Sequence, residues 1–297
     1  PALGGDTMRP RWPLPIGATR SITRVTRLPG VVSRRRRSCG YSGVMYAYGH
    51  GVARDDAHAA QLYQRACDAN DASGCDRLGY VYEVGRGVTR DEARAARLYQ
   101  RACNGSSMAG CAHLAGMYLN GRGVTRDDGR AVQLYQSACD GGEMHACDSL
   151  GALYYQGRVG TRDEARAGRL YQRACDGGEM DGCNDLGYVY QSGRGVPRDD
   201  ARAARFYQRA CDGGRMLGCY NLGLVYRKGE GVARDDARAA ELYRRACDGG
   251  EMSACNNLGV MYAQGIGVAR DRALANEMYR RACDGGDTTA CNNLRRR

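Results

Sequence analysis

Residues 171–187 read YQRACDGGEMDGCNDLG, and the two cysteines in this stretch, Cys175 and Cys183, stand eight positions apart. Residues that favour helix flank both cysteines, and a Gly-Gly step lies between them. In one continuous helix, positions i and i+8 are about 12 Å apart, whereas a disulfide needs Cα atoms within roughly 7 Å of each other. A bridge therefore requires the segment DGGEMDG to turn the chain, so that one helix ends at Cys175 and an antiparallel helix opens at Cys183.

This cysteine pair recurs along the chain with a fixed period of 36 residues. The seven pairs are Cys67 and Cys75, Cys103 and Cys111, Cys139 and Cys147, Cys175 and Cys183, Cys211 and Cys219, Cys247 and Cys255, and Cys283 and Cys291. The fifteenth cysteine, Cys39, falls where a second member would stand, and Val31 occupies its partner's slot. Such a period is typical of stacked repeats, in which each unit buries its face against its neighbours. We therefore predict one elongated solenoid over residues 39–297, made of seven 36-residue units and a C-terminal stub.

Each unit contains two apolar patterns with helical spacing. In the unit that starts at Cys75, the face of the first helix holds Cys75, Leu78, Gly79 and Tyr82. The face of the second helix holds Ala95, Leu98, Tyr99 and Ala102. Between the two helices, Gly85 suits a C-terminal cap and Asp91 suits the N-terminus of the next helix. The pattern predicts an all-α fold of helix pairs with no β-sheet.

Tyrosine fills one slot in each helix of every unit. The slot of the first helix holds Tyr46, Tyr82, Tyr118, Tyr154, Tyr190, Tyr226 and Tyr262, and that of the second holds Tyr63, Tyr99, Tyr135, Tyr171, Tyr207, Tyr243 and Tyr279. A tyrosine stripe also suits stacking on bases or sugars, but at this core-face spacing we interpret these side chains as packing residues. The Arg-Asp pair that recurs from Arg54–Asp55 to Arg270–Asp271 is interpreted as a helix start.

The net charge of +11 is concentrated at the two ends of the chain. Residues 1–38 carry nine arginines and one acid, and the chain closes on three arginines, which leaves the repeats neutral. A nucleic-acid-binding solenoid would repeat a basic stripe in every unit, so we expect no nucleic-acid partner. No run approaches the ~18 apolar residues of a membrane span, so we expect no membrane partner either. Residues 1–38 lack the repeat and are predicted to be a basic disordered segment, which resembles a mitochondrial presequence in its arginine content.

The paired cysteines indicate a disulfide framework, with Cys39 left as a free thiol. A metal site would need C-x-x-C clusters or convergent histidines, but no C-x-x-C occurs and the four histidines occupy four different repeat slots. We therefore expect no metal and no other cofactor. Because cytosolic thiols are kept reduced, the disulfides predict an extracytoplasmic location, periplasmic or secreted, with the mitochondrial intermembrane space as the alternative.

The repeated pattern LG-x-x-Y-x-x-G-x-G-V, then RD-x-x-x-A, then LY-x-x-AC resembles the Sel1-like repeat, a relative of the tetratricopeptide repeat. The added C-x7-C spacing is similar to the cysteine-rich subfamily typified by the Helicobacter cysteine-rich proteins. The resemblance covers residues 39–294 and departs from the pattern at 157–160 and at Ala115. It implies a right-handed α/α superhelix with one disulfide in each repeat, which serves as a scaffold for protein–protein contacts.

The same resemblance implies an alternative function, because members of the cysteine-rich branch bind penicillin and have weak β-lactamase activity. It would add a β-lactam or a peptidoglycan-related ligand to the expected protein or peptide partner. A serine β-lactamase needs a Ser-x-x-Lys pair, but Lys228 is the only lysine and Val225 stands three residues before it. We therefore assign no catalytic residue and expect an interaction scaffold rather than an enzyme.

The residues that vary between units at surface slots of the first helix are the candidates for partner binding. Fixed core slots beside variable surface slots are what a solenoid needs to present a particular surface on a generic frame. The predicted partner-binding residues are Tyr80, Tyr188, Leu224 and Arg227.

Overall fold

The computed structural model describes residues 32–158 and 160–295, which form fifteen α-helices and no strand. The odd-numbered helices are α1 (Val32–Tyr48), α3 (Ala72–Val84), α5 (Met108–Asn120), α7 (Met144–Gln156), α9 (Met180–Ser192), α11 (Met216–Lys228), α13 (Met252–Gln264) and α15 (Thr288–Arg295). The even-numbered helices are α2 (Asp56–Asp68), α4 (Glu92–Asn104), α6 (Asp128–Asp140), α8 (Glu164–Asp176), α10 (Asp200–Asp212), α12 (Asp236–Asp248) and α14 (Arg272–Asp284). The all-α prediction is confirmed over the described residues.

Each even-numbered helix begins at the aspartate of an Arg-Asp motif. Asp91 is the N-cap of α4, where its side chain accepts a hydrogen bond from the backbone N–H of Arg94 at 2.8 Å. In α2 to α12 the arginine before the cap adds an ion pair with the acid after it, as in the 2.9 Å contact between Arg198 and Asp200. The cap satisfies an N–H group that the first helical turn leaves unpaired, and it confirms the motif as a helix start.

The odd-numbered helices end as predicted but start earlier than predicted. Gly85 ends α3 in the left-handed conformation, with φ of 72°, which glycine adopts without steric cost. At its other end α3 begins at Ala72, three residues before Cys75, because Asp71 caps the helix by accepting a hydrogen bond from the N–H of Ser73. The prediction that the second cysteine opens this helix is therefore wrong by about one turn.

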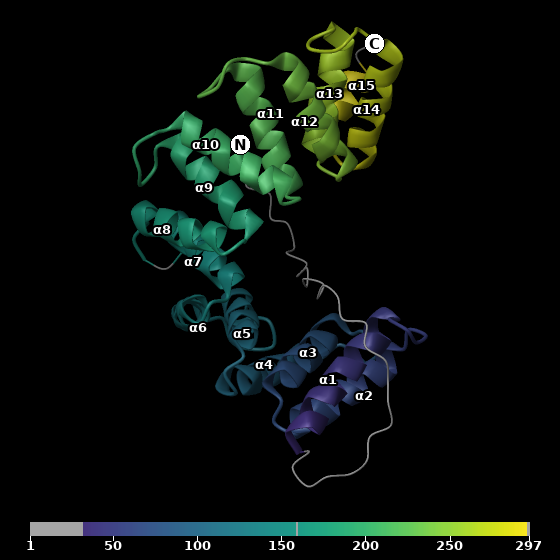
Figure 1. The fold of residues 1–297 in the computed structure, drawn as a ribbon, viewed down its shortest axis with the longest axis vertical. Helices are drawn as coiled ribbons and strands as arrows, with labels where there is room; N and C mark the ends of the chain where they lie inside the picture. Colours follow the sequence, from purple (N-terminus) through teal and green to yellow (C-terminus); the bar gives the residue numbers. More distant parts are fainter. Residues whose placement is uncertain (1–31, 159, 296–297) are drawn as a thin grey trace.

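The helix pairs stack into a curved solenoid. Consecutive helices pack against each other throughout the described chain, and α3 also contacts α5 as α7 contacts α9. Figure 1 shows the resulting arc, with α5, α7 and α9 on its inner side and α6, α8 and α10 on its outer side. We call the surface formed by the odd-numbered helices the inner surface and that formed by the even-numbered helices the outer surface.

The core of each pair depends on a glycine in the odd-numbered helix that meets a tyrosine of the next helix. The ring of Tyr207 lies so close to Gly187 that a Cβ atom there would stand 2.7 Å from the tyrosine Cε1 atom. Tyr207 is 1% exposed as a result of this close packing. In α5 the equivalent residue is Ala115, which is fully buried against a tyrosine, Tyr135, that is 7% exposed. This departure from the family pattern is therefore accommodated.

The tyrosines of the two slots differ in burial. Those of the even-numbered helices are all buried, between 0% and 7% exposed, as predicted for packing residues. Those of the odd-numbered helices are only half-buried, and several lie beneath an arginine of the following helix. The guanidinium carbon of Arg94, for example, is 4.2 Å from the centre of the Tyr82 ring. The packing interpretation holds for the first slot too, because all seven of its tyrosines pack against the buried core, and several of them also take part in cation–π contacts.

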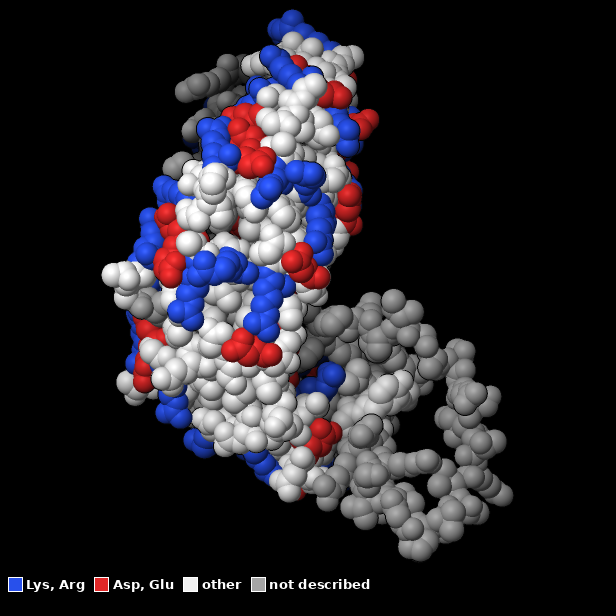
Figure 2. Space-filling model, turned by 60° about the vertical axis from the view of Figure 1, so that its left-hand side comes forward, with Lys and Arg blue, Asp and Glu red and all other residues white. Residues whose placement is uncertain are grey.

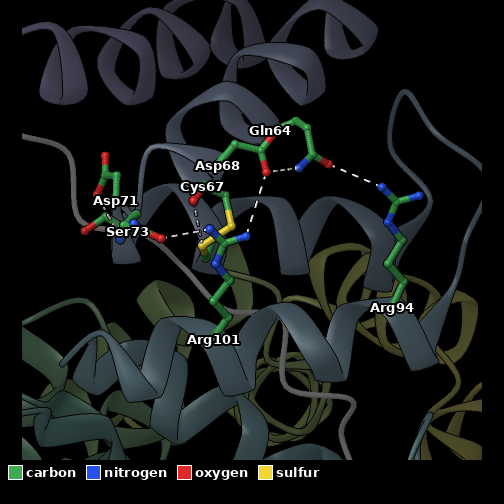
Figure 3. Close-up of a disulfide and its surroundings, with 9 residues drawn as sticks. Gln64, Cys67, Asp68, Asp71, Ser73, Arg94 and Arg101 are labelled. Atoms are coloured by element: carbon green, nitrogen blue, oxygen red, sulfur yellow. Dashed lines mark hydrogen bonds and ion pairs between the residues drawn. A yellow bond between two sulfur atoms is a disulfide. The ribbon is translucent and has the colours of Figure 1, made fainter.

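Seven disulfides join each even-numbered helix to the odd-numbered helix that follows it. Their Cα atoms are 4.4–4.8 Å apart, close enough for bridging without backbone movement. Figure 3 shows the bridge between Cys67 and Cys75, with Arg101 of the next unit beside it. Cys39 is the free cysteine among the described residues. Each bridge therefore links one unit to the next through the loop that the sequence predicts.

The N-terminal segment is described only in part. Residues 1–31, on which most of the disorder prediction falls, lie outside the described residues. Residues 32–38 belong to α1, so the boundary predicted at residue 39 falls inside a helix. The run Arg34–Arg37 is compatible with this extension, because arginine is a good helix former.

We expect the native protein to have an intact mass about 14 Da below that of the fully reduced protein, since each of the seven bridges removes two hydrogens. Alkylation of the unfolded, unreduced protein should label one thiol, at Cys39. A mass equal to that of the reduced chain, or fifteen alkylated cysteines, would contradict the framework.

Two glycine-to-alanine variants should change stability in opposite directions. Gly168 in α8 is buried, and a Cβ atom there would meet Val189 at an ordinary 3.6 Å, so Gly168→Ala should stabilise the protein by about 0.5–1 kcal/mol through helix propensity. Gly187→Ala should destabilise it by about 1–3 kcal/mol because the methyl group overlaps the Tyr207 ring. Urea unfolding of both variants measures the difference, and equal midpoints would refute this account of the core.

Candidate functional site

The arginines of the outer surface are engaged by neighbouring repeats. Arg209 in α10 donates a hydrogen bond to the carbonyl oxygen of Cys175 at 2.7 Å and forms an ion pair with Asp176. Equivalent bonds to a disulfide cysteine's carbonyl are made by Arg173, Arg245 and Arg281. Figure 2, which turns the left side of Figure 1 forward, shows basic and acidic side chains interspersed on the visible face. These arginines link successive units and do not build a continuous basic stripe on this face.

The inner surface carries most of the exposed large apolar side chains. Among the described residues these are Tyr41, Tyr48, Val84 and Tyr188 on odd-numbered helices and Leu274 on an even-numbered one. The middle row of the inner surface is formed by the ninth residue of each odd-numbered helix from α3 to α13. This row holds Tyr80, Gly116, Ala152, Tyr188, Leu224 and Val260. It therefore varies in size between neighbouring units, and we call it the inner row.

The predicted partner-binding residues lie along the inner surface but do not form one cluster. Tyr188 is 44% exposed, whereas Tyr80 and Leu224 are half-buried members of the same inner row. Arg227 is half-buried in α11, near the hydroxyl of Tyr243. The four residues are distributed over α3, α9 and α11. A partner that contacted all of them would have to lie along several units.

Polar pairs lie in several of the seams between neighbouring odd-numbered helices. The fifth residue of one helix meets the sixth residue of the next, 37 positions later. His113 Nδ1 lies 2.7 Å from Asp76 Oδ1, Asn221 donates to Asn184 at 2.9 Å, and Asn293 donates to Asn256 at 3.0 Å. Each of these seams therefore joins groups that can hydrogen-bond to each other.

The seam between α7 and α9 differs because it holds two acids, Asp148 and Asp185. Asp148 is 3% exposed, and its Oδ1 atom has no hydrogen-bond partner among the described residues. Asp185 is partly exposed and accepts a hydrogen bond from the Asn184 side chain at 3.2 Å. Two ionised carboxylates cannot donate to each other, so this seam lacks the complementarity of the others.

Burial is the main cause that raises the pKa values of both acids. Burial, together with the charge of Asp185, raises the pKa of Asp148 well above its usual range. Burial raises the pKa of Asp185 to about 6, against the smaller opposing effects of Asn184 and Arg215. The pair therefore holds a proton under mildly acidic conditions, whereas exposed aspartates do not. His113 behaves differently, since burial lowers its pKa but the contact with Asp76 more than compensates, and the net shift is upward.

Tyrosines surround the acid pair. Tyr171 lies under α7, where burial raises the pKa of its hydroxyl and the charges of Asp185 and Asp148 raise it further. Tyr155 and Tyr188 meet edge to face with ring centres 6.1 Å apart, which joins the seam to the exposed inner row. The arrangement combines carboxylates with aromatic rings on one part of the inner surface. It offers acceptors and π-faces but no nucleophile paired with a base.

Sequence reasoning identified Tyr188 but missed the acid pair beside it. A comparison of positions 36 residues apart shows which slots vary, but it does not pair positions 37 residues apart. An offset of 37 would have aligned Asp148 with Asp185 and Asp76 with His113. That offset is significant only once the odd-numbered helices are known to lie side by side.

No group of three or more histidine, cysteine, aspartate or glutamate side chains is placed to hold a metal ion in the described residues. Within the same part of the chain, no helix has the length and apolar character to cross a membrane.

The profile of the Sel1 repeat matches the chain seven times, at residues 38–71, 72–107, 109–143, 145–179, 181–214, 217–251 and 253–287. These matches span the array of helix pairs that the structure shows. The chain therefore belongs to the Sel1 repeat family.

Solved structures agree with this assignment. A Sel1 repeat protein from Oxalobacter formigenes is 27% identical with a TM-score of 0.72, and the match covers 90% of this chain and 78% of that protein. A protective antigen of uropathogenic Escherichia coli with an SLR fold is 27% identical with a TM-score of 0.71, over 89% of this chain and 57% of the antigen. The chain thus spans little more than half of that antigen.

Helicobacter pylori cysteine rich protein B is 30% identical over 46% of this chain and 98% of its own length, with a TM-score of 0.38. A search of curated proteins returned no match.

Replacing Asp185 tests the acid pair. The pKa of Asp185 is about 6 in the folded protein, against about 4 for an aspartate in the unfolded chain. The contribution of Asp185 to stability is therefore fully present below pH 4 and is lost as the pH rises through about 6. Asp185→Asn should therefore be more stable than wild type at pH 7.5, by about 1–3 kcal/mol, with the difference vanishing near pH 4. Urea unfolding across this pH range measures the effect.

The matched control is Asp212→Asn, which removes an exposed carboxylate of the outer surface. The titration of His113 is common to all three proteins and cancels in the comparison. An Asp185→Asn protein that is no more stable than wild type at pH 7.5 would show that burial in this seam does not raise the pKa of Asp185.

Proposed function

We propose that this chain is a scaffold that binds a protein partner along the inner surface of its solenoid. The main support for the proposal is that the residues of the inner row vary between units whereas the core residues beneath them stay nearly constant. Five of the six odd-numbered helices from α3 to α13 keep glycine against a buried tyrosine, while the inner row changes from Tyr188 to Leu224 between adjacent units. Such a surface distinguishes partners by shape from unit to unit.

Exposed aromatic side chains support a protein partner in particular. Tyrosines are enriched at protein interfaces because they bury a large apolar area while keeping a polar group for hydrogen bonding. Tyr48 and Tyr188 are each 44% exposed on the inner surface. A partner that covered them would remove apolar area from water without needing to displace the core.

The seven disulfides indicate an oxidising environment, outside the reducing cytosol. Within that class we propose the periplasm or the cell exterior, with the mitochondrial intermembrane space as the alternative.

Site-specific photo-crosslinking tests the scaffold proposal. A photoreactive phenylalanine analogue at Tyr188 should give a discrete protein adduct in the producing organism, because this position lies on the inner surface. The matched control replaces Arg205, which is exposed on the outer surface, and should give no such adduct. Equal adducts from the two positions, or none from Tyr188, Tyr48 and Val84 in turn, would refute partner binding on the inner surface.

The β-lactam alternative rests on family resemblance, and no described residue favours it. Turnover of the chromogenic β-lactam nitrocefin by the oxidised, purified protein, with heat-denatured protein as control, tests it directly. Turnover lost on denaturation would make the chain an enzyme and would require a site that the inner surface does not explain.

A further inference from the structure

The seam between α7 and α9 is the one seam whose two facing side chains are both acids. Asp148 and Asp185 occupy the positions that hold an acid with a histidine, or two amides, in the hydrogen-bonded seams described above. The buried Asp148 Oδ1 atom accepts no hydrogen bond from any described residue. A buried hydrogen-bond acceptor without a donor costs free energy, so this seam would be stabilised by a proton or by a cation from a bound molecule.

We infer that the Asp148–Asp185 pair, with Tyr188 beside it, is a binding site for a basic side chain, a lysine ammonium or an arginine guanidinium, of the protein partner. The inference rests on the proposed function, since it names the chemistry of the partner on the same inner surface. A basic side chain supplies both the positive charge and the N–H donors that this seam lacks.

The protein's own charges do not neutralise the pair. Arg215 is the cation whose charge acts on both carboxyls, and it forms its ion pair with Asp181 instead. Glu179 and Asp181 add negative charge beside Asp148. Together with the pair itself, these groups comprise four acids and one arginine, a balance that is complementary to a cationic ligand.

The neighbouring rings favour an organic cation over a bare metal ion. Tyr188 is 44% exposed and packs against Tyr155, and it stands three residues after Asp185 on α9, so an exposed aromatic ring lies one helical turn from this acid. Lysine and arginine gain from the face of such a ring through cation–π contact, whereas a divalent ion prefers a larger set of oxygen ligands. The described residues provide no third acid, histidine or cysteine placed to complete a metal site.

Selection from a random peptide library on immobilised, oxidised protein tests the inference. Peptides that bind wild type should be enriched in lysine or arginine, and the selected peptide should bind Asp185→Asn at least tenfold more weakly. Replacing its basic residue with glutamine should cause a similar loss. Asp212→Asn, which removes an equal charge from the outer surface, should bind the peptide as wild type does.

The pH dependence of peptide binding provides a readout that a purely structural role would not change. A bound cation favours the ionised pair, so the affinity of wild type should rise as the pH increases through about 6. The rise near pH 6 should be smaller in Asp185→Asn, in which Asp148 is the one carboxyl of the pair left to titrate. Other titratable or charged groups lie near the pair and are shared by both proteins, namely Glu179, Asp181, Arg215, Tyr155, Tyr171, Tyr188 and Tyr207.

The outcomes separate this inference from the scaffold proposal. Peptides that bind the inner surface, compete with the Tyr188 crosslink and show no preference for basic residues would overturn the inference and leave the scaffold standing. Equal loss of binding in Asp185→Asn and Asp212→Asn would also overturn it, because the effect would then be long-range attraction. Binding of Ca²⁺ or Mg²⁺ alone that Asp185→Asn abolishes, with no peptide binding, would replace the basic side chain by a metal ion. Absence of any inner-surface crosslink would overturn both proposals.

Discussion

The close crossing of two helices at each disulfide is the contact on which the rest of the solenoid depends. At the bridge between Cys175 and Cys183 the Cα atoms are 4.4 Å apart, and one residue earlier Gly182 lies over Ala174 so closely that a Cβ atom would stand 2.6 Å from the alanine Cβ. Small residues permit the approach and the bridge holds it. Because the same crossing is repeated at every junction, the direction of each unit relative to the last is set seven times by one local geometry.

Two surfaces of different character follow from this repeated crossing. On the outer side, arginines such as Arg209 reach back to the carbonyl oxygen of the preceding disulfide cysteine, so charge is used to join units. On the inner side, neighbouring odd-numbered helices come close enough for side chains 37 positions apart to meet, as Asn184 and Asn221 do. The inner surface therefore consists of a row of variable residues with polar seams between them. Residues of the inner row can therefore change, and binding specificity with them, without altering the packing of the core.

Much of this was accessible from the sequence. The period of the cysteines predicted the number of units, the helix pairs and the bridging pattern, and the Arg-Asp motif predicted the start of each even-numbered helix. The starts of the odd-numbered helices were missed because their caps are not uniform. Asp71 caps α3 with its side chain, whereas Arg215 at the same position of α11 makes no such bond. Tyr188 was recognised as variable, but its proximity to Tyr155 was not.

The sequence by itself determined the frame, because each unit repeats the same local signals and a helix pair joined by a short bridged loop depends mainly on residues close together in the chain. Tertiary structure alone decided which side chains of different units meet. The curvature of the stack brings odd-numbered helices together on one side, and it thereby places the buried Asp148 opposite Asp185. Two aspartates 37 residues apart carry no special meaning in a list of residues. They become a site because packing removes both from water in the same seam, where each makes the ionisation of the other more costly.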